Sequence, residues 1–232
     1  MGTSYNPKIV TDGLVLNLDA GNGKSYPGAG TSWVDLTKNK FNGTLTNSIY
    51  SSINQGAISF NGVDRYISGG DTSAVNNNYT ISSWFKPTGI PSINDTSGGV
   101  IFCQSTGAAA TNHGIWLSYS WANQTVIHAD RANDGIITNN NTAPQNSIIH
   151  AVGVWNGSTQ SVYINGNLST SRAYSLTPLS DSPLAYQVGR WGNPSYPRYF
   201  NGFIYSVQLY NRSLSAAEIL QNYNATKGRF GL

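Results

Sequence analysis

The side chains that could perform acid–base chemistry are few in this sequence. Glu218 is the only glutamate among 232 residues. It follows Ser215 at the spacing at which a serine hydroxyl and a glutamate carboxylate cap the first turn of a helix reciprocally. Hydrolysis of a glycosidic bond generally requires two carboxyl groups that flank the bond. Because the only glutamate is predicted to cap a helix, the sequence argues against a glycoside hydrolase.

A pair of aspartates is the alternative source of carboxylates. Asp130 and Asp134 flank Arg131 in the segment Ala129-Asp-Arg-Ala-Asn-Asp-Gly135, a spacing that could bring two carboxylates near each other. The same residues are typical of a turn with Asp-Gly at its apex and a local ion pair, which is the interpretation we favour. We therefore expect that the protein is not an enzyme.

Histidine and glycine patterns indicate no other catalytic, metal or nucleotide site. His113, His128 and His150 are isolated from one another, and no serine lies in a Gly-x-Ser-x-Gly elbow. Zinc binding would need clustered histidines or cysteine pairs. The glycine-rich segments lack the lysine and the strand-to-helix context of a phosphate-binding loop. His150 lies at a strand position, so we predict that it is packed or hydrogen-bonded inside the fold.

Two clusters of aromatic and polar residues could bind sugar, because pyranose faces stack on aromatic rings while polar side chains supply hydrogen bonds. In the cluster 116–121, Trp116 and two serines alternate with Tyr119 and Trp121, so one face of this strand could belong to the core. The cluster 189–199 is interrupted by glycine and prolines, which predicts a loop with exposed side chains. The predicted carbohydrate-binding or partner-binding residues are Trp191, Tyr196, Arg198, Arg190, Trp121 and Tyr119.

The elements that would position these clusters are β-strands. Only 10% of residues are charged and 12% are aromatic, and strand-forming runs alternate with polar turns throughout the chain. Residues 79–86 read as a strand that ends at Pro87. Residues 203–210 read as another, with residues 203, 205, 207 and 209 on one face and a partly polar second face. Asn156-Gly157 and Asn165-Gly166 predict two hairpin turns with positive φ at both turn positions.

One short helix is expected near the C-terminus, after the last strand. The capping pair formed by Ser215 and Glu218 begins it, and Leu214, Ile219 and Leu220 supply apolar contacts to the sheet. A helix of about ten residues is marginal alone, so we expect the sandwich to hold it in place.

The length fits a single domain, because β-sandwiches of this size commonly form one unit. We divide the chain into an N-terminal arm (1–12), one domain (13–225) and a C-terminal tail (226–232).

The lone Cys103 is predicted to be a small buried hydrophobe. A net charge of +3 without a basic run argues against nucleic acid as a partner. The polar N-terminus resembles no signal peptide, and no segment is long and apolar enough to insert in a membrane.

Four segments together resemble the laminin-G-like branch of the concanavalin-A-like jelly rolls. In chain order they are Ala57-Ile-Ser-Phe-Asn-Gly-Val-Asp-Arg-Tyr-Ile67, Tyr79-Thr-Ile-Ser-Ser-Trp-Phe-Lys-Pro87, His150-Ala-Val-Gly-Val-Trp155 with Val162-Tyr-Ile-Asn-Gly166, and Phe200–Ile204 through Tyr210–Ile219. The resemblance implies an all-β fold, an antiparallel two-sheet jelly-roll sandwich, with rim loops that carry whatever is bound. It leaves the ligand open.

Many proteins of this family bind one calcium ion at the rim of the sandwich, so the resemblance raises calcium as the one cofactor to consider. Asp19, Asp35 and Asp64 could supply carboxylate oxygens, with Asp64 the first candidate. Two carboxylates common in relatives are replaced, by Arg65 after Asp64 and by Tyr205-Ser206 in the last strand. We therefore expect no bound cofactor and Asp64 to be an ordinary turn residue, with a single calcium ion as the alternative.

Three further segments are similar to laminin-G-like proteins of tailed bacteriophages, especially aquatic ones. They are Gly13–Asn22, Ser25–Leu36 and Tyr223–Leu232. This resemblance implies a non-enzymatic virion structural protein, most simply a capsid decoration protein on the particle surface, made in the host cytoplasm. The alternative is a tail-fibre lectin that binds host surface polysaccharide; a glycan-degrading enzyme is the third. The expected partners are the major capsid protein or a tail protein, and the protein would be multicopy or homo-oligomeric.

Overall fold

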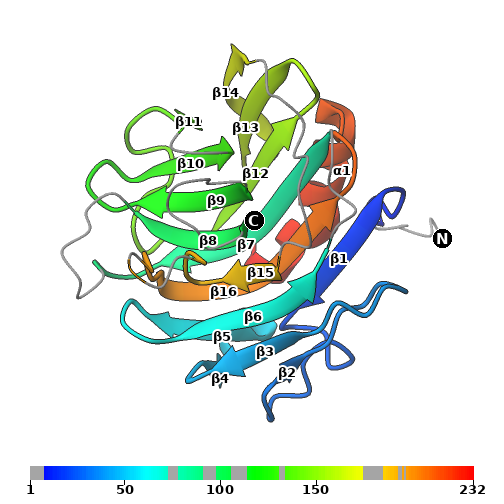
Figure 1. The fold of residues 1–232 in the computed structure, drawn as a ribbon, viewed down its shortest axis with the longest axis vertical. Coiled ribbons are helices and arrows are strands. Elements are labelled where there is room, and N and C mark those ends of the chain that lie inside the picture. The colour runs from blue at the N-terminus through cyan, green and yellow to red at the C-terminus, as the bar shows by residue number, and fades with distance from the viewer. Residues whose placement is uncertain are drawn as a thin grey trace.

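Two antiparallel β-sheets pack face to face, with one α-helix on the outside (Figure 1). The computed structural model describes residues 8–72, 78–90, 98–105, 114–130, 134–174, 185–192, 195 and 197–232. Within these residues the chain forms sixteen strands, one α-helix and two short 3-10 helices. The structure confirms the predicted all-β sandwich with a single short C-terminal helix, and its two-sheet arrangement is that of a concanavalin A-like jelly roll.

The first sheet carries the helix on its outer face. In order across the sheet its strands are β14 (Asn167–Ala173), β13 (Thr159–Ile164), β12 (Ile149–Trp155), β7 (Tyr79–Pro87), β16 (Asn201–Tyr210), β5 (Ala57–Asn61) and β4 (Ile49–Ser51), and β1 (Leu14–Asp19) also pairs with β16. A 3-10 helix, η1 (Ile53–Gln55), connects β4 to β5.

The second sheet packs against the inner face of the first. In order across it, its strands are β11 (Asp134–Ile137), β10 (Thr125–Asp130), β9 (Gly114–Ser120), β8 (Gly99–Ser105), β15 (Ala185–Val188), β6 (Tyr66–Asp71), β3 (Gly43–Thr46) and β2 (Ser32–Trp33). Every described pairing in both sheets is antiparallel.

The main core lies between the sheets and is built from inward-facing side chains of both. Phe85 of β7 and Phe102 of β8 are fully buried in it, as is Trp33 of β2. Because side chains alternate between the faces of a strand, each sheet also has an outward set of side chains. These outward sets differ between the two sheets, and that difference positions the candidate site.

The alternation along β16 changes partway through the strand. A bulge between Ile204 and Ser206 shifts the register against β7, so Phe203 and Tyr205 face outward while Val207 and Leu209 face the core. The predicted single face of residues 203, 205, 207 and 209 is therefore wrong. The extra residue of the bulge reverses the faces, and a strict period of two cannot anticipate it.

The two predicted hairpins join β12 to β13 and β13 to β14. Asn165 (φ 50°) and Gly166 (φ 81°) both adopt positive φ, as the Asn-Gly signal predicts. In the other turn only Gly157 does (φ 93°). There the Asn156 side chain accepts hydrogen bonds from the N–H groups of Ser158 and Thr159, so a longer loop replaces the two-residue turn.

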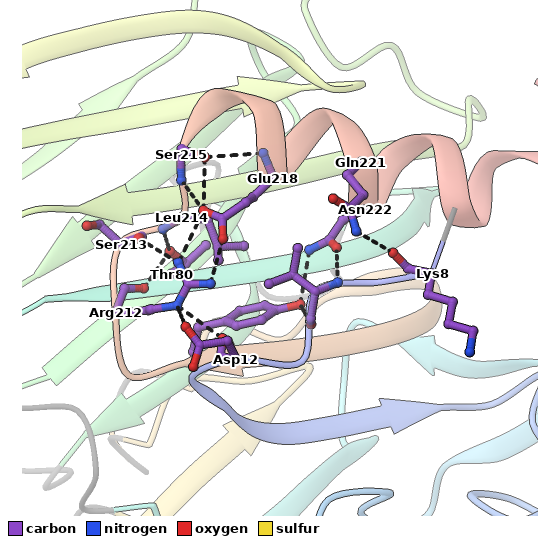
Figure 2. A network of polar contacts seen from close by, with 12 residues as sticks. Lys8, Asp12, Thr80, Arg212, Ser213, Leu214, Ser215, Glu218, Gln221 and Asn222 are labelled. Carbon is purple, nitrogen blue, oxygen red and sulfur yellow. Dashed lines mark hydrogen bonds and ion pairs between the residues drawn. The ribbon is translucent and has the colours of Figure 1, made fainter. Parts of the chain in front are cut away.

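The helix α1 (Ala216–Thr226) begins with the predicted capping box (Figure 2). The Glu218 backbone N–H donates to the Ser215 hydroxyl at 3.3 Å, and the Ser215 N–H donates to the Glu218 carboxylate at 2.9 Å. The carboxylate also pairs with Arg212 at 2.6 Å, and Arg212 reaches Asp12 at 2.8 Å. The hydrogen bond from Arg212 is the main reason that the pKa of Glu218 falls to about 2.

The helix buries one side against the first sheet. Leu214 and Ile219 are buried there, whereas Leu220, which the sequence placed among the apolar contacts, is 44% exposed. Below the helix, Trp84 of β7 stacks on Tyr223 with ring centroids 5.6 Å apart. Packing against the sheet therefore holds this short helix, in agreement with its marginal length.

Both ends of the described chain lie against the helix side. In the predicted arm, the Val10 N–H donates to Asn222 of α1 at 2.8 Å, and Gln221 donates to the Lys8 carbonyl at 2.7 Å (Figure 2). After α1 the 3-10 helix η2 (Lys227–Phe230) turns back, and Phe230 packs on Trp84 with ring centroids 4.4 Å apart. These residues of the predicted arm and tail are thus packed on the domain.

Cys103 is fully buried in β8 as a free thiol, which confirms its predicted role as a small hydrophobe. Burial raises the pKa of this thiol to about 12, so it is protonated and unreactive near neutral pH. Among the described residues, α1 is too short and too polar to cross a bilayer.

Candidate functional site

A groove of about 480 Å³ lies on the outer face of the second sheet. Strand β9 forms its floor: Leu117 and Tyr119 point into the core, while Trp116, Ser118 and Ser120 point outward. Neighbouring strands contribute further outward side chains. The groove is lined by Trp116, Ser118, Ser120, Ala122, Asn123, Thr125, Ile127, Ala129, Gly135, Ile137 and Arg198.

One end of the groove is a wall made by Trp116 and Arg198, and the buried Trp191 packs against both. The Trp116 and Trp191 rings lie with centroids 6.1 Å apart, and the Arg198 guanidinium lies 5.1 Å from the centre of the Trp191 ring. Such a cation over an indole face is attracted by the ring quadrupole. The backbone N–H of Trp191 donates to the Pro197 carbonyl at 2.6 Å, and this bond holds Trp191 next to Arg198. The wall is therefore assembled before any ligand arrives.

The backbone at Arg198 is strained. Its φ is 42°, a left-handed conformation that L side chains rarely adopt. The Arg198 carbonyl accepts a hydrogen bond from Val100 of β8 at 3.0 Å, which holds the strained residue against the sheet. Strain of this kind persists where the surrounding structure fixes it and is concentrated at functional sites. It places the guanidinium at the edge of the groove.

The floor combines hydroxyl groups with a small apolar surface. Ser118, Ser120 and Thr125 present hydroxyls that can each donate and accept, and Ile127 supplies apolar contact. Among the described residues, the buried Trp191 indole Nε1 and Thr125 hydroxyl have no hydrogen-bond partner. A ligand that carries hydroxyls along one edge and an apolar face along another would match the Ser118 and Ser120 hydroxyls and the Ile127 side chain of the floor.

The structure separates the predicted binding residues. Trp191 and Arg198 come together at the groove, although Trp191 is only 9% exposed because Trp116 and Arg198 cover it. Tyr119 and Trp121 lie in the core between the sheets, so they are unavailable to a ligand. Their strand has its other face outward, and the sequence could not tell which face that would be.

Two further predicted residues lie away from the groove lining or cannot be placed. The Arg190 guanidinium stacks on Tyr66 at 3.6 Å from the ring centre, and its Nε donates to Gln187 at 3.2 Å. Tyr196 lies outside the described residues. Besides Trp116, the groove residues that the prediction missed include the hydroxyls at 118, 120 and 125. The first two were visible in the sequence as the polar partners of Trp116 in an alternating strand.

The aspartates considered for calcium each have a structural partner. Asp64 accepts hydrogen bonds from the side-chain amides of Asn47 and Asn61, and Asp19 pairs with Arg229 at 2.6 Å. Asp35 is fully buried, where its carboxylate accepts from three backbone N–H groups and the Thr37 hydroxyl. Hydrogen-bond donors therefore contact the carboxylate oxygens of these three aspartates, and a cation would compete with those donors for the oxygen lone pairs. In the described part of the chain, no three His, Cys, Asp or Glu residues gather.

The candidate acid–base groups are also placed in structural roles. His150 is fully buried beneath the helix, where its Nε2 bonds to the Ser82 hydroxyl at 2.9 Å, which confirms the predicted packed histidine. His128 is buried between the sheets against the Tyr79 hydroxyl at 3.1 Å. Burial lowers the pKa of both rings to about 3, so both are neutral near pH 7.

The segment that could pair two aspartates is a hairpin between β10 and β11. Asp130 and Asp134 are directly opposite in the register of the two strands, and the residues between them, 131–133, lie outside the described residues. Asp134 and Gly135 lie within β11, and the predicted Asp-Gly apex is therefore wrong. Arg131 and the predicted ion pair fall outside the described residues, as does His113.

Comparison with solved structures finds the same fold in domains of several larger proteins. Domain 4 of AbnA, a GH43 extracellular arabinanase from Geobacillus stearothermophilus solved in complex with arabinotriose, superposes with a TM-score of 0.67 and 18% identity over 90% of this chain and 98% of that domain. Trypanosoma rangeli sialidase in complex with the inhibitor DANA matches with a TM-score of 0.67 and 17% identity, over 95% of this chain and 35% of the sialidase. The binding domain of Paraclostridial Mosquitocidal Protein 1 matches with a TM-score of 0.68 and 18% identity, over 92% of this chain and 52% of that chain.

These neighbours share the fold, and at such identities the likeness extends no further. Two of them are glycoside hydrolases, and this chain spans about a third of the sialidase. A search of curated sequences gave no significant match. The family profile described as the concanavalin A-like lectin/glucanases superfamily (Laminin_G_3) matches residues 61–220, which is 160 of 232 residues. The chain therefore belongs to the concanavalin A-like lectin/glucanase superfamily, as a laminin-G-like domain.

Proposed function

We propose that this protein is a non-enzymatic lectin whose groove on the second sheet binds polysaccharide. The observation that carries the proposal is the groove itself, in which Trp116, supported by the buried Trp191, meets the Arg198 guanidinium and a floor of hydroxyls. Sugars offer an apolar face to aromatic rings and hydroxyls to polar side chains. The fold neighbour solved with arabinotriose gives this ligand class a precedent within the same architecture.

The proposal of binding without cleavage rests on the carboxylates. Glu218 is held by Arg212 and by the start of α1, on the outer face of the opposite sheet from the groove. No described carboxylate lines the groove. Since glycosidic cleavage uses two carboxyl groups on either side of the bond, the described residues lack the required pair at the place where sugar would lie.

For the setting, we propose the exterior of a tailed-phage virion, on the basis of the resembling segments at 13–22, 25–36 and 223–232. A single weak lectin gains little unless many copies are displayed together, because avidity comes from linked sites. Capsid decoration would supply many copies, and a tail fibre would place a few copies at the host surface. Quantitative mass spectrometry of purified particles distinguishes the two roles by the copy number of the protein. A decoration protein would occur at a fixed ratio to the major capsid protein, whereas a tail-fibre protein would occur in only a few copies per particle. Absence of the protein from the particles would refute both roles.

The binding proposal is tested by filling the groove. Ser118 points outward from the floor, so Ser118→Trp would occupy the space of a sugar while leaving the core untouched. We expect at least about a tenfold loss of affinity for host polysaccharide and for arabinotriose, measured by isothermal titration calorimetry. Thr44→Trp is the matched control, because Thr44 is exposed on β3 of the same sheet and does not line the groove. Equal affinity in both variants would refute the groove as the binding site, and so would the absence of any glycan binding by the wild type.

A further inference from the structure

A second cavity, of about 620 Å³, lies on the outer face of the first sheet beside the helix. Its floor is a square of polar side chains from two paired strands. Asn17 of β1 is opposite Gln208 of β16, and Asp19 of β1 is opposite Ser206 of β16. The groove described above lies on the other sheet, so the two cavities are separated by the whole sandwich.

The helices α1 and η2 cover part of the outer face of the first sheet, and the polar floor lies next to the part that they cover. On the neighbouring strand β7 the outward side chain is Trp84, and α1 and η2 pack directly on it through Tyr223 and Phe230. On β16 the outward side chain at the same level is Ser206, which the cover does not bury. Gln208 nevertheless is only 8% exposed. The cavity is therefore recessed, and its polar floor is not an ordinary solvated sheet face.

The walls of the cavity are fixed by hydrogen bonds. On one side Arg229 of η2 donates to the Asn54 carbonyl at 2.8 Å, pairs with Asp19 at 2.6 Å and contacts the Gly56 carbonyl. On the other side the Leu36 N–H donates to the Asn17 carbonyl at 2.9 Å. A cavity whose walls are tied to the sheet in this way is preformed, which lowers the entropy cost of binding.

Side-chain amides are the most frequent polar groups of the lining, which also includes the Lys227 ammonium, 5.3 Å from the centre of the Tyr223 ring. Asn17 and Gln208 meet through a long contact of 3.5 Å that engages one donor and one acceptor, while each amide can make up to four hydrogen bonds. Asn22, Gln55 and Asn224 add further amides around the rim. The Asp19 charge is neutralised by Arg229. Paired amides that both donate and accept suit a neutral ligand rich in hydroxyl groups.

An aromatic edge completes the lining. Phe230 of η2 lines the cavity, and its ring is held by packing on Trp84 and on Tyr205, with ring centroids 4.4 Å and 5.0 Å away. A fixed ring beside amide groups provides the apolar surface on which the face of a pyranose or furanose packs. The volume lies within the range of pockets that hold small ligands.

We propose that this cavity is a second binding site, for a neutral saccharide unit, on the face opposite the groove. It rests on its own residues and does not depend on the groove being a glycan site. With both sites occupied, one chain can hold two glycan strands on opposite faces. Such a protein bridges polysaccharide chains without forming an oligomer, and linked sites of this kind raise avidity.

The test observes each site separately in the intact protein. Side-chain amide signals of Asn17 and Gln208 are followed by ¹⁵N-resolved NMR while arabinotriose or maltotriose is added to millimolar concentration. We expect saturable shifts of these signals in wild type and in Ser118→Trp, whose groove is blocked. Gln208→Ala should weaken the binding measured at the remaining Asn17 signal by about tenfold. Asn167→Ala, which removes an exposed amide on β14 outside both cavities, should leave it unchanged.

The outcomes separate this inference from the proposed function. If the groove signals of Ser120 and Thr125 move while those of Asn17 and Gln208 stay constant with both sugars, the second site is refuted and the groove stands. If Asn17 and Gln208 respond while the groove residues do not, the second site stands and the groove proposal fails. Equal binding by Gln208→Ala and wild type, with both folded by circular dichroism, would also overturn the second site.

Discussion

Each outer face of the sandwich carries an outward-pointing tryptophan, and the surroundings of that tryptophan differ between the two faces. On the first sheet, the outward Trp84 is 3% exposed because the helix side of the same chain covers it, through Tyr223 and Phe230. On the second sheet, the outward Trp116 is 7% exposed, packs beside Trp191 and lines a groove with the surface that remains. An outward tryptophan is therefore not by itself a sign of a binding site. What covers it decides whether it becomes core or forms the wall of a site.

The largest expected effect is on the covered face. Trp84→Ala should destabilise the fold by about 3–5 kcal/mol, because it removes the surface on which α1 and η2 pack and leaves a cavity beneath them. Chemical denaturation monitored by circular dichroism measures the change. Trp84→Phe serves as the control, since it keeps an aromatic surface and loses mainly the hydrogen bond from the indole to Thr226 at 2.9 Å. A loss below about 1 kcal/mol in Trp84→Ala would show that the helix is not held by this face.

The covered face also buries His150, and this buried histidine makes the stability of the fold sensitive to acid. The pKa of His150 is about 3 in the folded chain, against 6.5 without the fold, so the unfolded chain binds more protons between these values. Stability is therefore full above about pH 6.5 and falls as the pH drops from 6.5 toward 3. Each buried histidine contributes a slope of up to about 1.4 kcal/mol per pH unit.

His128, buried between the sheets, adds a second contribution of the same sign, since burial lowers its pKa to about 3 as well. His150→Gln should reduce the slope of stability between pH 6 and pH 4 by about half, whatever it does to stability at pH 7. Urea denaturation at a series of pH values gives both quantities. An unchanged acid slope in His150→Gln would contradict a buried neutral His150.

Sequence reasoning succeeded where the determinants are local. The capping box needs only Ser215 and Glu218 and is present as predicted. Asn165-Gly166 forms the predicted tight turn, whereas the same dipeptide at Asn156-Gly157 forms a longer loop. The order of motifs along the chain also identified the fold, because each motif specifies a strand or turn by itself and the family arranges them in one order.

Reasoning from sequence failed where the outcome depends on distant partners. The bulge in β16 exists because of its pairing with β7, and nothing near Ile204 indicates it. The choice of Trp116 rather than Tyr119 as the outward residue depends on which face meets the other sheet. The contact between Trp116 and Trp191 joins residues far apart in sequence. The groove could be predicted as a class of site, but its assembly required the sheet topology.

A smaller effect is expected at the start of the helix. Glu218→Ala removes the return bond of the capping box and the Arg212 ion pair, and should cost about 1 kcal/mol at pH 7. Glu218→Gln keeps a side chain that can accept from Ser215 and should cost less. Because the folded pKa of Glu218 is about 2 against 4.5 unfolded, this contribution is present above about pH 4.5 and fades toward pH 2. Thermal unfolding at pH 7 and pH 3 measures it; an equal loss at both values would rule out the ion pair as its source.

The smallest effect on stability, and the sharpest test of the contrast between the faces, is expected at Arg198. Its guanidinium lies on the rim of the groove, where it contacts the Trp191 ring, and alanine keeps the Cβ that disfavours the left-handed backbone (φ 42°), so the substitution leaves the backbone strain unchanged. Arg198→Ala should therefore change stability by no more than about 0.5 kcal/mol. It should weaken glycan binding about tenfold, since one charge-assisted hydrogen bond accounts for about 1.4 kcal/mol.

Arg65→Ala is the matched control for that change, because it removes the same charge from the turn between β5 and β6, outside the groove lining. Calorimetric binding and denaturation curves on both variants give affinity and stability separately. If Arg198→Ala lowers the free energy of unfolding as much as Trp84→Ala does and leaves glycan affinity unchanged, the side chains on the second outer face serve stability, as those on the first face do. If affinity alone falls, the second face is organised for a ligand, and the cover supplied by α1 and η2 is what makes the first face different.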